Sequence, residues 1–147
     1  MKGNATLPHP RSYSVNGWLS GNFRLYRIRW PEDSSLKSEG FDSPTKASMI
    51  RYPGPAEVFT FIDEQEQSTD DGFFFIPVGD GSSGWGDLAA DRHNQAGNLA
   101  FLDGHVESHR WRAPKRFHGH NVGTDGKLDL EDKQWLERRL PWRAPWL

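Results

Sequence analysis

Histidines and acids bracket a short apolar run in "DRHNQAGNLAFLDGHVESHRW", residues 91–111. Asp91 and His93 come before the run, and Asp103 and His105 lie at an Asp-Gly step within it. Imidazole and carboxylate groups gathered in this way suit zinc, manganese or a reacting centre. The same residues also have structural uses, since a short polar side chain tolerates a tight turn and His93 can hydrogen-bond that turn. Both interpretations stay open.

An acid-rich segment, "IDEQEQSTDDG", supplies further carboxylates at Asp63, Glu64, Glu66, Asp70 and Asp71. Paired carboxylates, one protonated and one charged, carry out glycoside hydrolysis. Such a cluster is also typical of a solvated loop or a cation site. In the enzymatic interpretation, the catalytic residues are Asp63, Glu64, His93 and Asp103.

On a strand, His105, Glu107 and His109 would share one face. These three residues form either a row of metal ligands or the wet side of an edge strand. The sequence does not separate the two.

Residues 121–132, "NVGTDGKLDLED", are laid out like a twelve-residue calcium loop of the EF-hand or dockerin kind. Gly126 stands where such a loop needs a sharp turn, but position 3 is a glycine and position 12 is Asp rather than Glu. The simpler alternative is a turn at Asp125-Gly126 followed by an N-cap at Asp129. The predicted calcium ligands are Asn121, Asp125, Lys127 through its carbonyl, Asp129 and Asp132.

Three tryptophans occur where burial is less expected: Trp85 in a Gly-rich loop, and Trp142 and Trp146 in the tail. Exposed aromatic faces stack on sugar rings, whereas a tryptophan near a terminus also packs down as a clasp. These three are therefore candidate glycan-binding residues.

Composition limits the class of protein. A chain of 147 residues suits a single domain over residues 1–147, with 1–11 as a flexible start. A net charge of −2 offers no basic surface for nucleic acid. Seven Trp and nine Phe argue against disorder, and the absence of Cys excludes disulfides. No apolar stretch approaches the roughly 18 residues of a membrane span.

The elements that would position these groups are short. Aromatic and β-branched runs predict strands within 12–30, at 57–64 and at 73–78, the last two pairing across the acid-rich turn. Asp103-Gly104 predicts a β-hairpin over 98–111 with a type I′ turn. Ser43-Pro44 indicates a short helix, and 130–140 an amphipathic one. The predicted fold is α+β, an antiparallel sheet with short helices at its margins.

The spacing of His93 from Asp103-Gly104 resembles the H-x9-DG signature of prepilin-type, processing-associated proteins. "SYSVNGWL", "PAEVFTFIDEQEQSTDDGFF" and "DKQWLERRLP" are similar to further motifs of that family, in the same order from Ser12 to Pro141. The resemblance implies a pilin-like globular head. Family members begin with an apolar anchor helix, which is absent here, so an excised head or a soluble relative is expected.

The resemblance implies a non-enzymatic, extracytoplasmic head that packs or binds, calcium-stabilised if the 121–132 segment holds the ion. Its partners would be other pilin-like subunits. The alternative is a secreted carbohydrate-active protein that acts on an extracellular polysaccharide. It would be either a glycoside hydrolase using the paired carboxylates or a glycan-binding module using the tryptophans.

Overall fold

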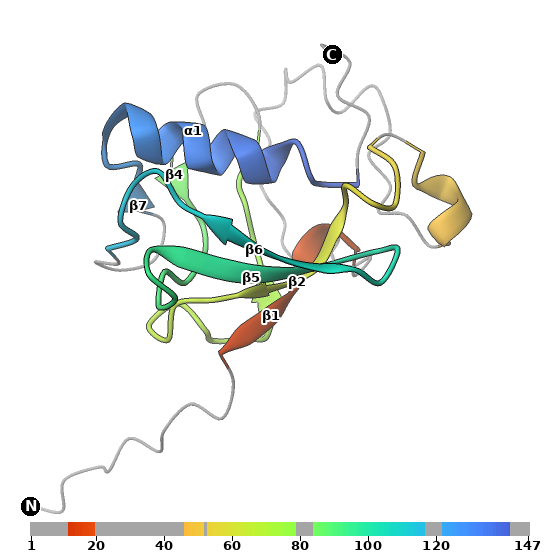
Figure 1. Ribbon diagram of the computed structural model, residues 1–147, viewed down its shortest axis with the longest axis horizontal. Helices are drawn as coiled ribbons and strands as arrows, with labels where there is room; N and C mark the ends of the chain where they lie inside the picture. The colour runs from red at the N-terminus through yellow and green to blue at the C-terminus, as the bar shows by residue number, and fades with distance from the viewer. Residues whose placement is uncertain (1–11, 20–45, 52, 79–83, 117–121, 142–147) are drawn as a thin grey trace, which may run out of the picture.

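The computed structural model describes residues 12–19, 46–51, 53–78, 84–116 and 122–141. Five strands form a mixed sheet in the order β3-β1-β2-β5-β6, and two short strands, β4 and β7, pair separately. The helix α1 lies across one face of the sheet (Figure 1). Bounds of the elements are β1 Tyr13–Asn16, β2 Phe59–Asp63, β3 Phe73–Phe74, β4 Gly84–Trp85, β5 Ala96–Phe101, β6 Val106–Arg110, β7 Val122–Gly123 and α1 Gly126–Glu137, with 3₁₀ turns at Gly17–Leu19 and Ala47–Met49.

The broad α+β class is confirmed, but the sheet is not purely antiparallel. β3 pairs with β1 in parallel, not with β2 as predicted. The connection between β2 and β3 is no tight turn, and β1 enters between the two strands. It is held there because the Val15 N–H donates to the Gly72 carbonyl at 3.0 Å and the Asn16 side chain donates to the Phe59 carbonyl at 2.8 Å.

The hairpin of β5 and β6 is confirmed, and β5 lies next to β2 as expected. Its turn is not type I′, because among the described non-glycine residues only Asn94 and Gln95 have positive φ. The Gly104 N–H donates to the Phe101 carbonyl at 3.0 Å, and Gly104 takes φ 95°. These features fit a three-residue loop with a bulge at the glycine. The first residue of this loop, Leu102, donates its N–H to the Val58 carbonyl at 2.9 Å.

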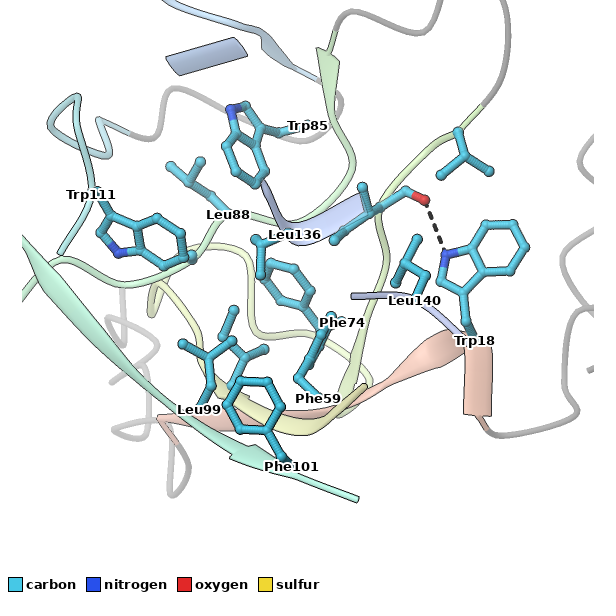
Figure 2. Close-up of a cluster of buried hydrophobic side chains, with 14 residues drawn as sticks. Trp18, Phe59, Phe74, Trp85, Leu88, Leu99, Phe101, Trp111, Leu136 and Leu140 are labelled. Carbon is cyan, nitrogen blue, oxygen red and sulfur yellow. Dashed lines mark hydrogen bonds between the residues drawn. The ribbon is translucent and has the colours of Figure 1, made fainter. Parts of the chain in front are cut away.

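The hydrophobic core lies between the inner face of the sheet and α1 (Figure 2). Leu136 and Leu140 approach from the C-terminal segment, and both are fully buried. Trp18 closes one end of the core and donates its indole N–H to the Ile76 carbonyl at 3.1 Å. The core consists of Trp18, Phe59, Ile62, Phe74, Ile76, Val78, Trp85, Leu88, Ala89, Leu99, Phe101, Trp111, Leu136 and Leu140.

The helix α1 runs over Gly126–Glu137 rather than the predicted 130–140. Gly126 has φ 82°, so the chain turns sharply as the helix begins. The predicted flexible start at 1–11, the second aromatic run within 12–30 and the Ser43-Pro44 helix start lie outside the described residues.

Leu136→Ala should lower the free energy of unfolding by about 2–5 kcal/mol, because it leaves a cavity between α1 and the sheet. Leu128→Ala is the matched control on the same helix, since Leu128 is 45% exposed. Its effect should stay within about 0.5 kcal/mol. Urea denaturation of both variants measures the difference, and equal effects would contradict the packing described.

Candidate functional site

A buried lysine joins α1 to the segment that follows β6. The Lys115 side chain is 0% exposed, and its Nζ lies 2.7 Å from Asp129 Oδ1 and 2.5 Å from Asp132 Oδ2. The two aspartates are three residues apart on α1, so they project from the same face of the helix. One ammonium group therefore meets two carboxylates inside the protein.

Two tryptophan rings form the apolar walls of this cluster. Lys115 Nζ lies 5.2 Å from the centre of the Trp85 ring and 5.3 Å from that of Trp111, within the range of cation–π attraction. The Trp85 Nε1–H donates to Asp129 Oδ2 at 2.8 Å, and the Trp111 Nε1–H donates to the Ala90 carbonyl at 2.8 Å. Both walls are thus fixed in orientation.

Backbone N–H groups satisfy the remaining carboxylate oxygens. The Asp125 N–H donates to Asp129 Oδ2 at 2.9 Å. The Arg112 and Ala113 N–H groups donate to Asp132 at 3.0 and 3.1 Å. Because the cluster is out of contact with water, this full set of donors is what makes two buried carboxylates tolerable.

Asp91, the first acid of the 91–111 segment, holds the chain that carries the lysine. Its Oδ2 accepts the Lys115 backbone N–H at 2.8 Å. The Lys115 carbonyl accepts the Gln65 side-chain N–H at 3.1 Å. Asp91 therefore has a structural partner rather than a place beside His93 in a metal site.

The predicted calcium ligands are only partly brought together. Asp129 and Asp132 face the Lys115 ammonium, while Asp125 and Lys127 are exposed and Asn121 lies outside the described residues. A calcium ion at those two carboxylates would meet the lysine charge, so the described geometry does not fit the ion there. Calcium binding by this segment stays an untested prediction.

Asp63 and Glu64 do not form a facing pair of carboxylates. They are consecutive on and after β2, so their side chains point to opposite faces of the sheet. Glu64 is 0% exposed, and its carboxylate accepts hydrogen bonds from the hydroxyls of Ser14 and Ser68, the latter at 2.8 Å. Burial raises the pKa of Glu64, although both hydroxyls oppose that effect.

His93 reaches Asp63 rather than the Asp103-Gly104 turn that it was expected to tie down. Its Nε2 lies 3.6 Å from Asp63 Oδ2, which also accepts the backbone and side-chain N–H groups of Asn98 at 3.1 Å. Asp103 lies at the other end of β5 and contacts His105 Nδ1 at 2.6 Å. The nine-residue spacing of the motif is therefore the span of β5 and its flanking turns. The four predicted catalytic residues do not converge.

The three residues of the predicted row, His105, Glu107 and His109, do not form a common site either. His105 stacks on Phe101 with ring centres 4.3 Å apart, and His109 stacks on Trp135 at 3.5 Å. Burial lowers the pKa of His109, because an imidazolium would lose water beneath α1. Within the described ranges, no group of three or more His, Asp or Glu residues is placed to hold a metal ion.

The tryptophan prediction is wrong for Trp85, which is 1% exposed and offers no free ring face to a sugar. Trp85 is buried because β4 pairs with β7, and this pairing places the Trp85 ring against the N-terminal part of α1. Trp142 and Trp146 lie outside the described residues.

No protein-family model matches the chain, and no curated protein and no solved structure matches it at a significant level. In the part of the chain that the structure describes, no helix is long and apolar enough to cross a membrane.

A partly buried acid, Asp87, lies near the fully buried Glu64. Its Oδ2 accepts the Phe75 N–H at 2.6 Å. Burial raises the pKa of Asp87 from 3.8 to about 7, with a smaller contribution from the negative charges of Glu64, Asp70 and Asp71. The folded protein thus holds a proton that the unfolded chain has already released, so stability falls as the pH rises through this window.

Asp87→Asn should remove this loss while keeping an acceptor for the Phe75 N–H. We expect the variant to match the parent near about pH 4 and to be more stable by on the order of 2–4 kcal/mol near about pH 8. Urea denaturation across that range measures the effect. Asp70→Asn, at an exposed position, is the control, and an equal gain there would contradict the role of burial.

Calcium should leave the melting temperature unchanged relative to EDTA, because the Lys115 ammonium already contacts both carboxylates, Asp129 and Asp132, where the ion would have to sit. An ion that binds only the folded state raises the melting temperature with its concentration. Thermal unfolding at several calcium concentrations is the measurement. A rise with calcium that Asp125→Ala abolishes would instead establish the ion at this segment.

Proposed function

We propose that the chain is a non-enzymatic, pseudopilin-like head domain that acts outside the cytoplasm by packing against pilin-like subunits. The observation that carries this proposal is an apolar row across the face of the five-stranded sheet opposite α1 (Figure 1). Directly paired residues of neighbouring strands point to the same face. The row is Phe73, Val15, Phe61, Ala100 and Val106, one residue from each strand.

Several side chains of this face are exposed to solvent. Phe61 is 46% exposed, Val106 68% and the neighbouring Tyr13 55%. The rings of Tyr13 and Phe61 meet edge to face with centres 6.2 Å apart. Contiguous apolar side chains on a surface are typical of an interaction site.

A second copy of the chain is the partner that we propose for this row. The row carries no charge, so it can meet itself across a twofold axis without like charges facing each other. Beside it runs a polar row of Asp63, Asn98 and Ser108, in which Asp63 already accepts both N–H groups of Asn98. An apolar centre with a satisfied polar rim is the usual composition of a subunit interface.

The family resemblance supports the same proposal. Its motif residues occupy positions that shape the head: Asn16 at the end of β1 and Trp18 just after it are buried, and the H-x9-DG spacing spans β5. The proposed location outside the cytoplasm rests on this resemblance alone.

Phe61→Arg should weaken self-association by about tenfold or more, because a charge in the middle of the row would be desolvated in the interface. Sedimentation equilibrium over a range of protein concentrations measures the effect. Leu128→Arg on α1 is the matched control, since Leu128 is 45% exposed on a different face.

The thermal unfolding of both variants checks that each remains folded. A parent protein that stays monomeric at all concentrations, or equal effects of the two substitutions, would contradict the proposed packing.

A further inference from the structure

We propose that Lys115 and Asp129 become joined by an intramolecular isopeptide bond, which the folded protein forms by itself with Asp132 as the proton carrier. The inference is independent of the proposed packing through the sheet face. It rests on the arrangement of an amine, two carboxylates and two aromatic walls in the interior.

The reacting groups are held in contact and away from water. Lys115 Nζ lies 2.7 Å from Asp129 Oδ1, and the two side chains are 0% and 6% exposed. An amine and a carboxyl group fixed at this distance no longer lose the entropy of meeting, which is a large part of the barrier to amide formation. The rings of Trp85 and Trp111 on either side exclude the water that would reverse the reaction.

The second carboxylate oxygen of Asp129, Oδ2, is held by two hydrogen-bond donors. It accepts the Trp85 Nε1–H at 2.8 Å and the Asp125 N–H at 2.9 Å. When Nζ adds to the carboxyl carbon, negative charge develops on that oxygen, and two fixed donors there stabilise the tetrahedral intermediate. On Asp132 the two backbone donors, Arg112 and Ala113, both reach Oδ2, the oxygen that contacts Lys115 at 2.5 Å. Its other oxygen, Oδ1, accepts only the Arg112 N–H, so Asp132 lacks a pair of donors opposite the lysine.

Asp132 is placed to move the protons. Its Oδ2 takes one proton from the Lys115 ammonium and passes it to Oδ1 of Asp129, which leaves a neutral amine beside a neutral carboxyl group. The amine nitrogen then bonds to the carboxyl carbon, and Asp132 carries a second proton to the departing hydroxyl. The C–O bond breaks and water leaves; the third proton stays on the amide nitrogen. Lysine ammonium plus aspartate carboxylate thus give one amide and one water, with no oxidant or cofactor.

The bond would staple α1 to the segment after β6. A covalent link between two parts of the chain reduces the freedom of the unfolded state, as a disulfide does. This chain has no cysteine and so cannot form a disulfide. An isopeptide bond would give it a covalent cross-link that needs no oxidising environment.

Mass spectrometry of the intact, denatured parent protein tests the proposal directly. We expect a mass lower than the sequence mass by one water molecule. Trypsin should then release a branched peptide that joins residues 113–116, uncleaved after Lys115, to residues 128–133. Fragmentation of that peptide should place the link at Asp129.

Three variants separate the roles. Lys115→Arg retains a cation but offers no amine, and Asp129→Ala removes the acceptor, so both should show the full sequence mass. Asp132→Asn keeps the shape and both reacting groups, and it should also show the full mass, or acquire the bond far more slowly.

A parent protein that is folded and keeps its full sequence mass after prolonged incubation would overturn the proposal, leaving an ion pair only. A link at Asp132 instead of Asp129 would overturn the assignment of acceptor and proton carrier. Complete bond formation in Asp132→Asn would overturn the role of that carboxylate.

Discussion

The arrangement of α1 depends on the buried ion pairs that Lys115 makes with Asp129 and Asp132. A buried ion pair is costly to assemble but far more costly to break, since removing one partner leaves an unpaired charge in the interior at about 3–5 kcal/mol. Here one cation faces Asp129 and Asp132, and N–H donors from β4, from the start of α1 and from the segment after β6 compensate the excess negative charge. Parts of the chain that share no strand pairing are thereby held in one geometry. The core leucines of α1 then have a fixed surface to pack against.

Local patterns of the sequence were enough to predict elements whose partners are close in the chain. The Asp103-Gly104 step between two apolar runs specified the hairpin, and the apolar spacing of Leu136 and Leu140 specified the buried side of a C-terminal helix. The pairing of β3 could not be predicted in this way. Its partner β1 lies far back in the sequence, and the choice between β1 and β2 depends on contacts such as Asn16 to Phe59 that no local pattern contains.

The same limit applies to the site. The sequence predicted roles for Asp129, Asp132 and Trp85, but as calcium ligands and a glycan-binding residue. The sequence predicted no role for Lys115, because a lysine in "WRAPKRF" resembles any exposed basic loop. The pattern that indicates such a lysine is a pair of acids at i and i+3, Asp129 and Asp132, on a helix that also buries leucines. Buried acids need a cation from elsewhere in the chain. Spacing identified the acids, whereas only the tertiary fold supplied their counter-ion.

The interior position of β1 in the sheet, between β3 and β2, has a mechanical consequence. A pull on the chain ahead of Tyr13 acts along the axis of a strand that is bonded to β2 on one edge and to β3 on the other. Hydrogen bonds of a ladder lie across the strand direction, so tension loads both ladders in shear, and they must yield together rather than one after another. The sheet is thus built to bear force that enters from its N-terminal side. The same pull along the edge strand β6 would load only one ladder, the one that it forms with β5.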